Sequence, residues 1–442
     1  MKTLFPIAIL IAMSTMVACN LPAGDGASEV TGSGGTDFQT TQGLQPVEPS
    51  DPGALIWPQD LVYQGAFRLP DDPNGEGLGW EWGGGALTYY PEGDPEGADD
   101  GFPGSLFGSG HDWYTHVSEV GIPIPVIPGS QDLEVLPIAP TLQGFASITA
   151  GLVGPLEIPR VGLEYLPHLE GQGGGRLYFA FAQHMGETET LPSHGWAGLD
   201  LSNPQPAGLW RVGEYWNYVT GDYLFAIPPE WADLYTPGMY LATGRFRDGG
   251  QGGMGPSAFA IRVGDAGDPP APGSTLAAIP LLQYASVYAE TGPAAMINYS
   301  HADEWNGAAW LTSGGRAAVI FAGTKATGET WYGCMDGTVW PDDPPYPPEC
   351  PERGWWSTQF EGQILFYDPA ALAAVATGRD QPWEPQPYAI MPVDQILYNV
   401  TSPQQKSHVG GIAFDRSRGL IYLLELFADG DKPLVHVWAI QP

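Results

Sequence analysis

Gly411-Ile412-Ala413-Phe414-Asp415, close to the C-terminus, is the first of three short runs that decide the fold. The second run is Leu420-Ile421-Tyr422-Leu423-Leu424, and the third is Val435-His436-Val437-Trp438-Ala439-Ile440. Aromatic and branched apolar residues are frequent in all three, and turn-forming or polar residues separate them. This pattern predicts a meander of three short strands.

The same triplet of runs occurs five times along the chain, which indicates a repeat architecture. The first run of a triplet is often led by glycine, the second is more continuously apolar, and the third is a short alternating strand. The first runs are residues 85–90, 162–166, 223–227, 307–311 and 411–415. The second runs are residues 105–108, 176–180, 238–242, 318–322 and 420–424. The third runs are residues 117–122, 196–201, 257–261, 363–367 and 435–440.

A fourth, weaker strand is expected after each of the first four triplets. No such run follows Ile440, so the fifth unit needs an outer strand from elsewhere, and Leu61-Val62-Tyr63-Gln64-Gly65 reads as that strand. Four-stranded units completed by the opposite end of the chain would remove unpaired sheet edges. The expected fourth strands are residues 142–145, 209–212, 282–284 and 396–399.

This organisation resembles the β-propeller domains of secreted bacterial proteins, in which strands from both ends of the chain close the ring. We expect an all-β, five-bladed propeller, with six or seven blades, or a pair of β-sandwiches, as alternatives. The units recur about every 79 residues, against 40–45 in WD40 blades, so long insertions are expected on one face. No WD, kelch or Asp-box signature is present, so the resemblance covers the fold of about residues 58–442 and implies no activity.

Composition agrees with an all-β domain. The chain of 442 residues contains 61 Gly and 45 Pro, and Trp, Tyr and Phe number 16, 20 and 16, which favours short strands joined by turns. Residues 369–376, followed by Gly378, predict the one helix that we expect.

The N-terminus carries a secretory signal. One positive charge at Lys2 precedes a short apolar run, and the segment ends in Met16-Val17-Ala18-Cys19. These residues resemble the lipobox of bacterial lipoproteins, which implies a signal peptide over 1–18 and diacylation (palmitate-type chains) of Cys19. An ordinary signal peptide is the alternative. Residues 19–55, rich in Gly, Ser, Thr and Pro, predict a disordered tether, and residues 56–442 the propeller.

The same resemblance predicts where the protein works. Asn20 follows the cysteine, and the absence of Asp there resembles lipoproteins that are sent to the outer membrane of Gram-negative bacteria. We therefore expect an extracytoplasmic protein held to a membrane by its lipid anchor.

Charge limits the possible partners. Lys and Arg total 16 and Asp and Glu total 50, a formal net charge of −34, which excludes nucleic acid as a ligand. Acidic turns at residues 71–76 and 429–431 could hold Ca²⁺, although ordinary hairpins explain them equally well. No metal-ligand triad is recognisable in the sequence.

Two further cysteines remain. Cys334 and Cys350 form an even pair, and an extracytoplasmic compartment is oxidising, so we expect a disulfide that closes the proline-rich loop between them. A metal site is less favoured, because two thiols without a nearby histidine supply only half a ligand set.

Polar residues follow the second strand of each unit and would form a ring at one mouth of a propeller. Glu81, His301 with Asp303 and Glu304, and His408 precede first strands and could reach the same mouth. Imidazoles and carboxylates together suit acid–base chemistry or ligand binding. The alternative is that these side chains bond between blades. The five ring residues are His111, His184, Arg245, Lys325 and Glu425.

Two functions are compatible with this mouth. In the favoured one, the propeller is a surface module that binds a glycan-like or protein ligand, or acts as a scaffold. In the other, it is a glycan hydrolase or lyase, an interpretation that rests on analogy of fold. His111 or His184 would then act as base or metal ligand and Glu81 or Glu304 as the carboxylate. Arg245 and Lys325 would hold an anionic group, and aromatic side chains would stack on sugars: Trp113, Tyr114, Trp216, Trp331 and Tyr332.

Overall fold

Five sheets of four or more strands form the protein in a computed structural model. The structure describes residues 50–71, 79–94, 97, 101–111, 113–114, 116–154, 156, 160–167, 175–183, 190–245, 253–264, 269–285, 294–350 and 352–441. Within those residues the prediction of an all-β, five-bladed propeller is confirmed. The predicted signal peptide over residues 1–18 and Cys19 lie outside them.

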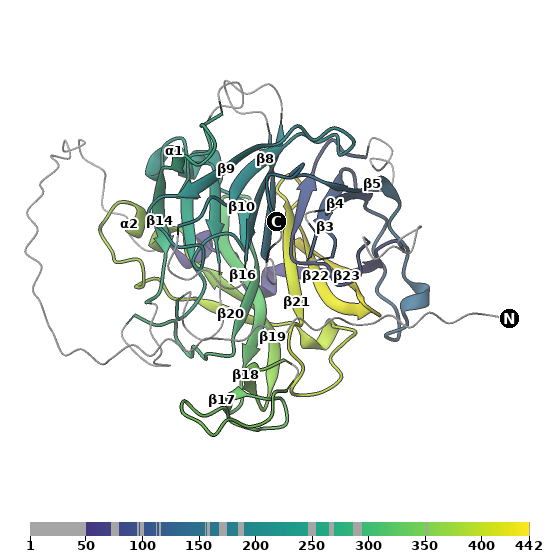
Figure 1. Cartoon of the computed structure of the whole chain (residues 1–442). Coiled ribbons are helices and arrows are strands. Elements are labelled where there is room, and N and C mark those ends of the chain that lie inside the picture. The colour runs from purple at the N-terminus through teal and green to yellow at the C-terminus, as the bar shows by residue number, and fades with distance from the viewer. Residues whose placement is uncertain are drawn as a thin grey trace, which may run out of the picture. The chain divides into compact units, whose positions relative to one another are not determined.

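In the first four blades, the four main strands follow one another along the chain (Figure 1). Blade 1 contains β2 (Leu87–Tyr90), β3 (Ser105–Ser109), β4 (His116–Gly121) and β5 (Thr141–Ser147). Blade 2 contains β6 (Arg160–Leu166), β7 (Arg176–Ala182), β8 (His194–Ala197) and β9 (Ala207–Val212), with β13 (Thr275–Leu276) parallel to β9. Blade 3 contains β10 (Tyr223–Ala226), β11 (Leu241–Gly244), β12 (Ala258–Ile261) and β14 (Ala278–Leu282). Blade 4 contains β15 (Glu304–Ser313), β16 (Arg316–Ala326), β19 (Phe360–Tyr367) and β20 (Ala389–Pro392).

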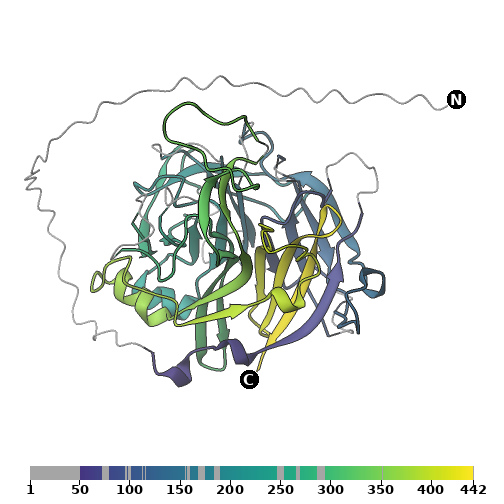
Figure 2. The same cartoon turned by 90° about the horizontal axis from the view of Figure 1, so that it is seen from below.

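Blade 5 joins the two ends of the domain. It consists of β21 (Val409–Asp415), β22 (Leu420–Asp429), β23 (Lys432–Ile440) and β1 (Leu61–Arg68), in the order β1-β23-β22-β21. The antiparallel register of β1 and β23 places Tyr63 opposite Trp438, and Figure 2 shows the purple N-terminal strand lying along the yellow C-terminal ones. The prediction that residues 61–65 supply the missing outer strand is confirmed.

The first strand of every blade lies at the axis. β2 contacts β6, β6 contacts β10, β10 contacts β15, β15 contacts β21, and β21 contacts β2, so the innermost strands follow one another around a ring. The blades pack through their apolar faces, and Tyr89 of β2 stacks on Tyr422 of β22 with ring centroids 6.1 Å apart. The core is therefore a set of apolar layers between neighbouring sheets.

Elements outside the blades agree with the sequence in part. α2 (Pro369–Ala376) is the predicted helix, begun by the Asp368 carboxylate, which accepts a hydrogen bond from the Ala370 N–H at 2.8 Å. α1 (Pro229–Tyr235) was not predicted. Among the described residues no helix has the length and apolar character needed to cross a bilayer.

One predicted strand is wrong. Residues 396–399 do not form the outer strand of blade 4, which is β20; Asp394–Ile396 is instead a 3-10 turn, η6. The Asp394 carboxylate accepts the Gly362 N–H at 2.7 Å, and this bond favours a turn where a further strand was expected.

A stapled hairpin extends from blade 4. It consists of β17 (Thr330–Gly333) and β18 (Gly354–Ser357), and the predicted disulfide between Cys334 and Cys350 closes the loop between these strands. Three short 3-10 turns complete the described elements: η1 (Pro52–Ala54), η2 (Pro58–Asp60) and η4 (Leu133–Val135).

Candidate ligand site at the propeller axis

A pocket lies on the axis, at the end where the innermost strands begin. All five blades contribute to it, through Gly85, Val161, Asp222, Asn306 and Gly410, and its volume is about 120 Å³. Residues of blades 1 and 5 that neighbour these strands complete its wall. They are Trp82, Gly83, Ser407, Leu426 and Phe427.

Glycine closes the axis below this axial pocket. A Cβ on Gly307 would collide with the carbonyl oxygen of Gly410, and a Cβ on Gly410 would collide with that of Gly84. The backbones of blades 1, 4 and 5 therefore approach more closely than a side chain would permit. The remaining cavity there has a volume of about 10 Å³, which is room for about one water molecule. The axial pocket is a cup, because the channel is blocked beneath it.

Three residues of the cup have left-handed backbone conformations. Trp82 has φ 61°, Ser407 φ 58° and Phe427 φ 56°. Such conformations cost about 1–3 kcal/mol each in residues other than glycine, and they concentrate at functional sites. The Trp82 N–H donates to the Asp431 carbonyl at 2.8 Å, and the Trp82 and Phe427 rings meet edge to face with centroids 5.6 Å apart. The backbone thus holds an aromatic pair at the rim, with Trp82 51% exposed.

A buried carboxylate forms the polar wall. Asp222, which directly precedes β10, forms an ion pair with Arg245, whose Nε lies 3.1 Å from Asp222 Oδ1. Arg245 also donates to the Asn217 carbonyl at 2.8 Å and lies over the Tyr218 ring, 5.1 Å from its centroid. Asn306 donates to the Val409 carbonyl at 3.4 Å. The wall therefore presents a carboxylate, an amide and no cation of its own, because Arg245 is fully buried.

None of the ring residues that the structure describes is among the residues that line the axial pocket, and Lys325 and Glu425 form buried polar contacts instead. Lys325, near the end of β16, forms a buried ion pair with Asp303, Nζ to Oδ1 2.8 Å. Glu425, on β22, accepts from His436 Nε2 at 2.7 Å and from the N–H groups of Tyr398 and Asn399 at 2.7 and 2.6 Å. These carboxylates therefore hold the strand ends in place.

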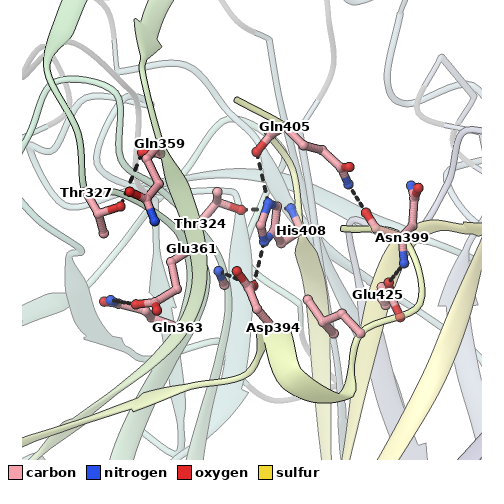
Figure 3. A network of polar contacts seen from close by, with 12 residues as sticks. Thr324, Thr327, Gln359, Glu361, Gln363, Asp394, Asn399, Gln405, His408 and Glu425 are labelled. Atoms are coloured by element: carbon pink, nitrogen blue, oxygen red, sulfur yellow. Dashed lines mark hydrogen bonds and ion pairs between the residues drawn. The ribbon is translucent and has the colours of Figure 1, made fainter. Parts of the chain in front are cut away.

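His408 lies at the junction of blades 4 and 5 (Figure 3). Its Nδ1 is 2.8 Å from Asp394 Oδ1, and its Nε2 donates to the Gln405 carbonyl at 2.9 Å. Its backbone N–H donates to Thr324 Oγ1 of β16 at 2.8 Å. Since the ring is buried and both nitrogens have partners, His408 fixes the loop that carries Ser407 to the axial pocket.

The remaining candidates are dispersed. His301 is buried, 3.1 Å from the Tyr299 hydroxyl and with its ring 4.5 Å from that of Trp355. Glu304 opens β15 and is partly exposed. His184 lies outside the described residues.

Glu81 and His111, both of blade 1, lie close enough to interact electrostatically. Burial lowers the pKa of His111, and the Glu81 charge opposes this shift. Glu81 Oε2 is buried without a hydrogen-bond partner among the described residues. A neutral imidazole beside an unsatisfied carboxylate oxygen is suited to proton transfer.

A polar chain crosses the opposite end of the axis. Glu164 of β6 accepts from Thr88 Oγ1 at 3.0 Å and from the Ala226 N–H at 3.2 Å. Arg416, which follows β21, donates to the Ala226 carbonyl at 3.3 Å and to Thr312 Oγ1 at 3.0 Å. Burial raises the pKa of Glu164 to about 8, and its hydrogen bonds and the Arg416 charge oppose the rise. These five residues link all five blades.

The sequence did not single out the residues of the axial pocket. Asp222, Asn306, Trp82 and Phe427 share no motif, and left-handed φ angles at aromatic residues leave no trace in composition. Asp222 stands just before a first strand, as Glu81 and His301 do, so that position was the available signal.

Nothing in the described parts assembles three His, Cys, Asp or Glu side chains for a metal ion. The acidic turn at 429–431 is a β-hairpin turn, in which the Asp429 carboxylate pairs with Arg68 at 3.0 Å and with Lys432 at 3.2 Å. Most of the turn at 71–76 lies outside the described residues. The sequence matches no protein-family model and no curated protein.

Proposed function

We propose that this protein is a lipid-anchored, extracytoplasmic propeller that binds the end group of a ligand in its axial pocket. The observation that carries the proposal is the coincidence of three left-handed residues, Trp82, Ser407 and Phe427, in one pocket lined by all five blades. Three of the seven left-handed residues other than glycine in the described parts lie in this one cup, and ligand binding would explain the cost of that backbone strain.

The size and charge of the pocket define the ligand. A cavity of about 150 Å³ holds a whole benzene molecule, so about 120 Å³ admits only part of an end group the size of a sugar ring, with the rest of the ligand outside. The net charge of −34 disfavours an anion. We infer an uncharged or cationic end group, such as a terminal neutral or amino sugar, packed against Trp82.

Binding can be followed by the fluorescence of exposed Trp82. Matched oligosaccharides ending in a neutral sugar, an amino sugar or a uronate serve as probes. The first two should saturate the signal, and the uronate should bind most weakly. Trp82→Ala and Phe427→Ala should each weaken binding about tenfold when it is measured by calorimetry, the equivalent of about 1.4 kcal/mol. Trp113→Ala is the control, because Trp113 is 75% exposed and outside the pocket. No saturable binding, or equal losses in all three variants, would reject the site.

The anchor has its own test. Cys19 carries the acyl chains in this proposal, so the wild-type protein should incorporate radioactive palmitate and sediment with membranes. Cys19→Ser should abolish labelling and release the protein into the soluble extracytoplasmic fraction. A Cys19→Ser protein that still sediments with membranes would contradict the lipid anchor. That result would not bear on ligand binding in the axial pocket.

A glycan hydrolase or lyase is the second candidate, favoured by the unsatisfied oxygen of Glu81 beside His111. Release of reducing ends from polysaccharides by the wild type, and its loss in both Glu81→Gln and His111→Ala, would support the enzyme. Binding that survives both substitutions without turnover would reject it.

A further inference from the structure

A second, larger pocket lies beside blade 4 and shares no residue with the axial pocket. It has a volume of about 470 Å³, within the range of sites for small molecules. Residues 296–300 form one wall, and β16, β19, β20, residues 327–330 and Pro387 supply the rest. The wall is tied in place, because the Ile297 N–H donates to Gln386 Oε1 at 2.7 Å and the Met296 N–H donates to the Met254 carbonyl at 2.9 Å.

Lys325 gives this blade-4 pocket an ammonium group. Its Nζ donates to Asp303 Oδ1 at 2.8 Å and to the Ala326 carbonyl at 2.7 Å, and these are its partners within the described residues. An ammonium group has three N–H donors, so one remains for a ligand. Because Lys325 lines the pocket and is only 8% exposed, a ligand oxygen would meet this donor with little competition from water.

The charge of Lys325 is already balanced. Asp303 is fully buried and also accepts the N–H groups of Ser300 and Ala326, both at 3.0 Å. Burial raises the pKa of Asp303 to about 6, and Lys325 opposes the rise, so the carboxylate is ionised at pH 8. A ligand carboxylate would place a second negative charge beside Asp303 with no second cation to offset it. The third donor therefore suits an uncharged oxygen, such as an amide carbonyl.

Aliphatic side chains form part of the remaining wall, beside polar groups from Tyr299, Ser300, Thr327, Thr330 and Gln363. Met296, Ile297, Leu365 and Ile390 form apolar walls, of which Ile297 is 56% and Ile390 41% exposed. Asn298, also exposed, makes no side-chain hydrogen bond with the described residues and can both donate and accept. An aliphatic wall beside one ammonium donor and the Asn298 amide matches a branched alkyl group joined to an amide.

We propose that the blade-4 pocket binds an uncharged amide with a branched aliphatic side chain, its carbonyl oxygen accepting from Lys325 Nζ. Its ligand chemistry is distinct from that of the axial pocket, and the proposal does not depend on the axial site. The alkyl group would lie against Ile297 and Ile390, and Asn298 would bond the second amide group.

The test compares two probes of the same shape, N-acetyl-leucine amide and N-acetyl-leucine, by saturation-transfer NMR titration at pH 8. The uncharged amide should bind at least about tenfold more tightly than the carboxylate, since only the carboxylate adds an unbalanced charge. Equal affinity, tighter binding of the carboxylate, or no saturable binding of the amide would each overturn the proposal.

Variants at other positions locate the binding, because removing Lys325 alone would leave the buried Asp303 carboxylate without its ion-pair partner. Ile390→Asp places a charge on the exposed wall and should weaken amide binding at least about tenfold. Leu142→Asp is the matched control, since Leu142 is 39% exposed on blade 1 and should leave affinity unchanged. The neutral pair Asp303→Asn with Lys325→Met should remove the preference for the amide probe. Wild-type affinity in Ile390→Asp, or an unchanged preference in the double variant, would overturn the assignment.

Discussion

Glu164→Gln should remove a pH dependence from the stability of the propeller. The side chain lies where the blades meet, and glutamine keeps an oxygen for the Ala226 N–H without a proton to lose. In the wild-type protein, burial raises the pKa of Glu164 from 4.5 to about 8. The folded state therefore retains a proton that the unfolded state releases between these two pH values.

The sign and size of the effect follow from this proton. The contribution of Glu164 to the free energy of unfolding is fully present below pH 4.5 and is lost as the pH rises toward 8. Each pKa unit is worth about 1.4 kcal/mol, so the shift sets an upper limit of about 5 kcal/mol. Since Glu164 keeps partial contact with solvent, we expect about 2–4 kcal/mol.

Urea denaturation followed by tryptophan fluorescence at pH 5, 6, 7 and 8 measures the effect. The quantity of interest is the wild-type minus Glu164→Gln difference in unfolding free energy, because Asp303 and other groups titrate equally in both proteins. This difference should fall steadily from pH 5 to pH 8. Glu329→Gln, an exposed carboxylate without a side-chain partner among the described residues, should give no slope. A difference for Glu164 that is independent of pH would refute the reasoning.

Three further changes test the axis and the staple. Ser407→Gly should raise the free energy of unfolding by about 1 kcal/mol in urea denaturation, because glycine adopts the left-handed conformation of this residue without strain. The serine side chain makes no hydrogen bond among the described residues, so none is lost. A loss of stability would contradict the claim that Ser407 is strained. Gly410→Ala should lower the free energy of unfolding by at least about 2 kcal/mol, because it forces blades 1 and 5 apart. Gly144→Ala, where the added Cβ meets open space, should change the melting temperature little. Similar shifts in the two variants would show that the axis is not tightly packed. Reducing the disulfide between Cys334 and Cys350, which are 16 residues apart, should destabilise the loop by about 3 kcal/mol. Amide hydrogen exchange in β17 and β18 should then become faster. Unchanged exchange would show that the aromatic contacts of the loop, and not the disulfide, keep it ordered.

The blades could be predicted from the sequence because most of their strands can be recognised from their own apolar residues. Apolar runs such as Ile421–Leu424 recur in all five units, and the missing fourth strand of the last unit identifies the segment around Tyr63 as its substitute. The outer strand of blade 4 could not be found in this way, because Ala389–Pro392 is short, half-exposed and contains proline, while residues 396–398 are the strand-favouring Ile, Leu and Tyr. Edge strands depend on their neighbours, so their own residues constrain them weakly.

The candidate site was harder to predict, for a physical reason. Aligning the strands singled out the charged residues Arg245, Lys325 and Glu425, but could not reveal that each is paired with a buried partner. Those partners are distant in sequence or placed by loop geometry. The aromatic rim at Trp82 depends on backbone angles that the chain adopts only when blades 1 and 5 meet.

The pairing of β1 with β23 also determines when the last blade can form during synthesis. A ribosome makes residues 61–68 early and residues 432–440 last, about 364 residues later. At about 5–20 residues per second, the first strand waits roughly 20–70 seconds for its partner. Throughout that interval its backbone hydrogen-bonding groups are open to other chains. A nascent molecule is therefore most at risk of aggregation at the strand that later completes its final blade.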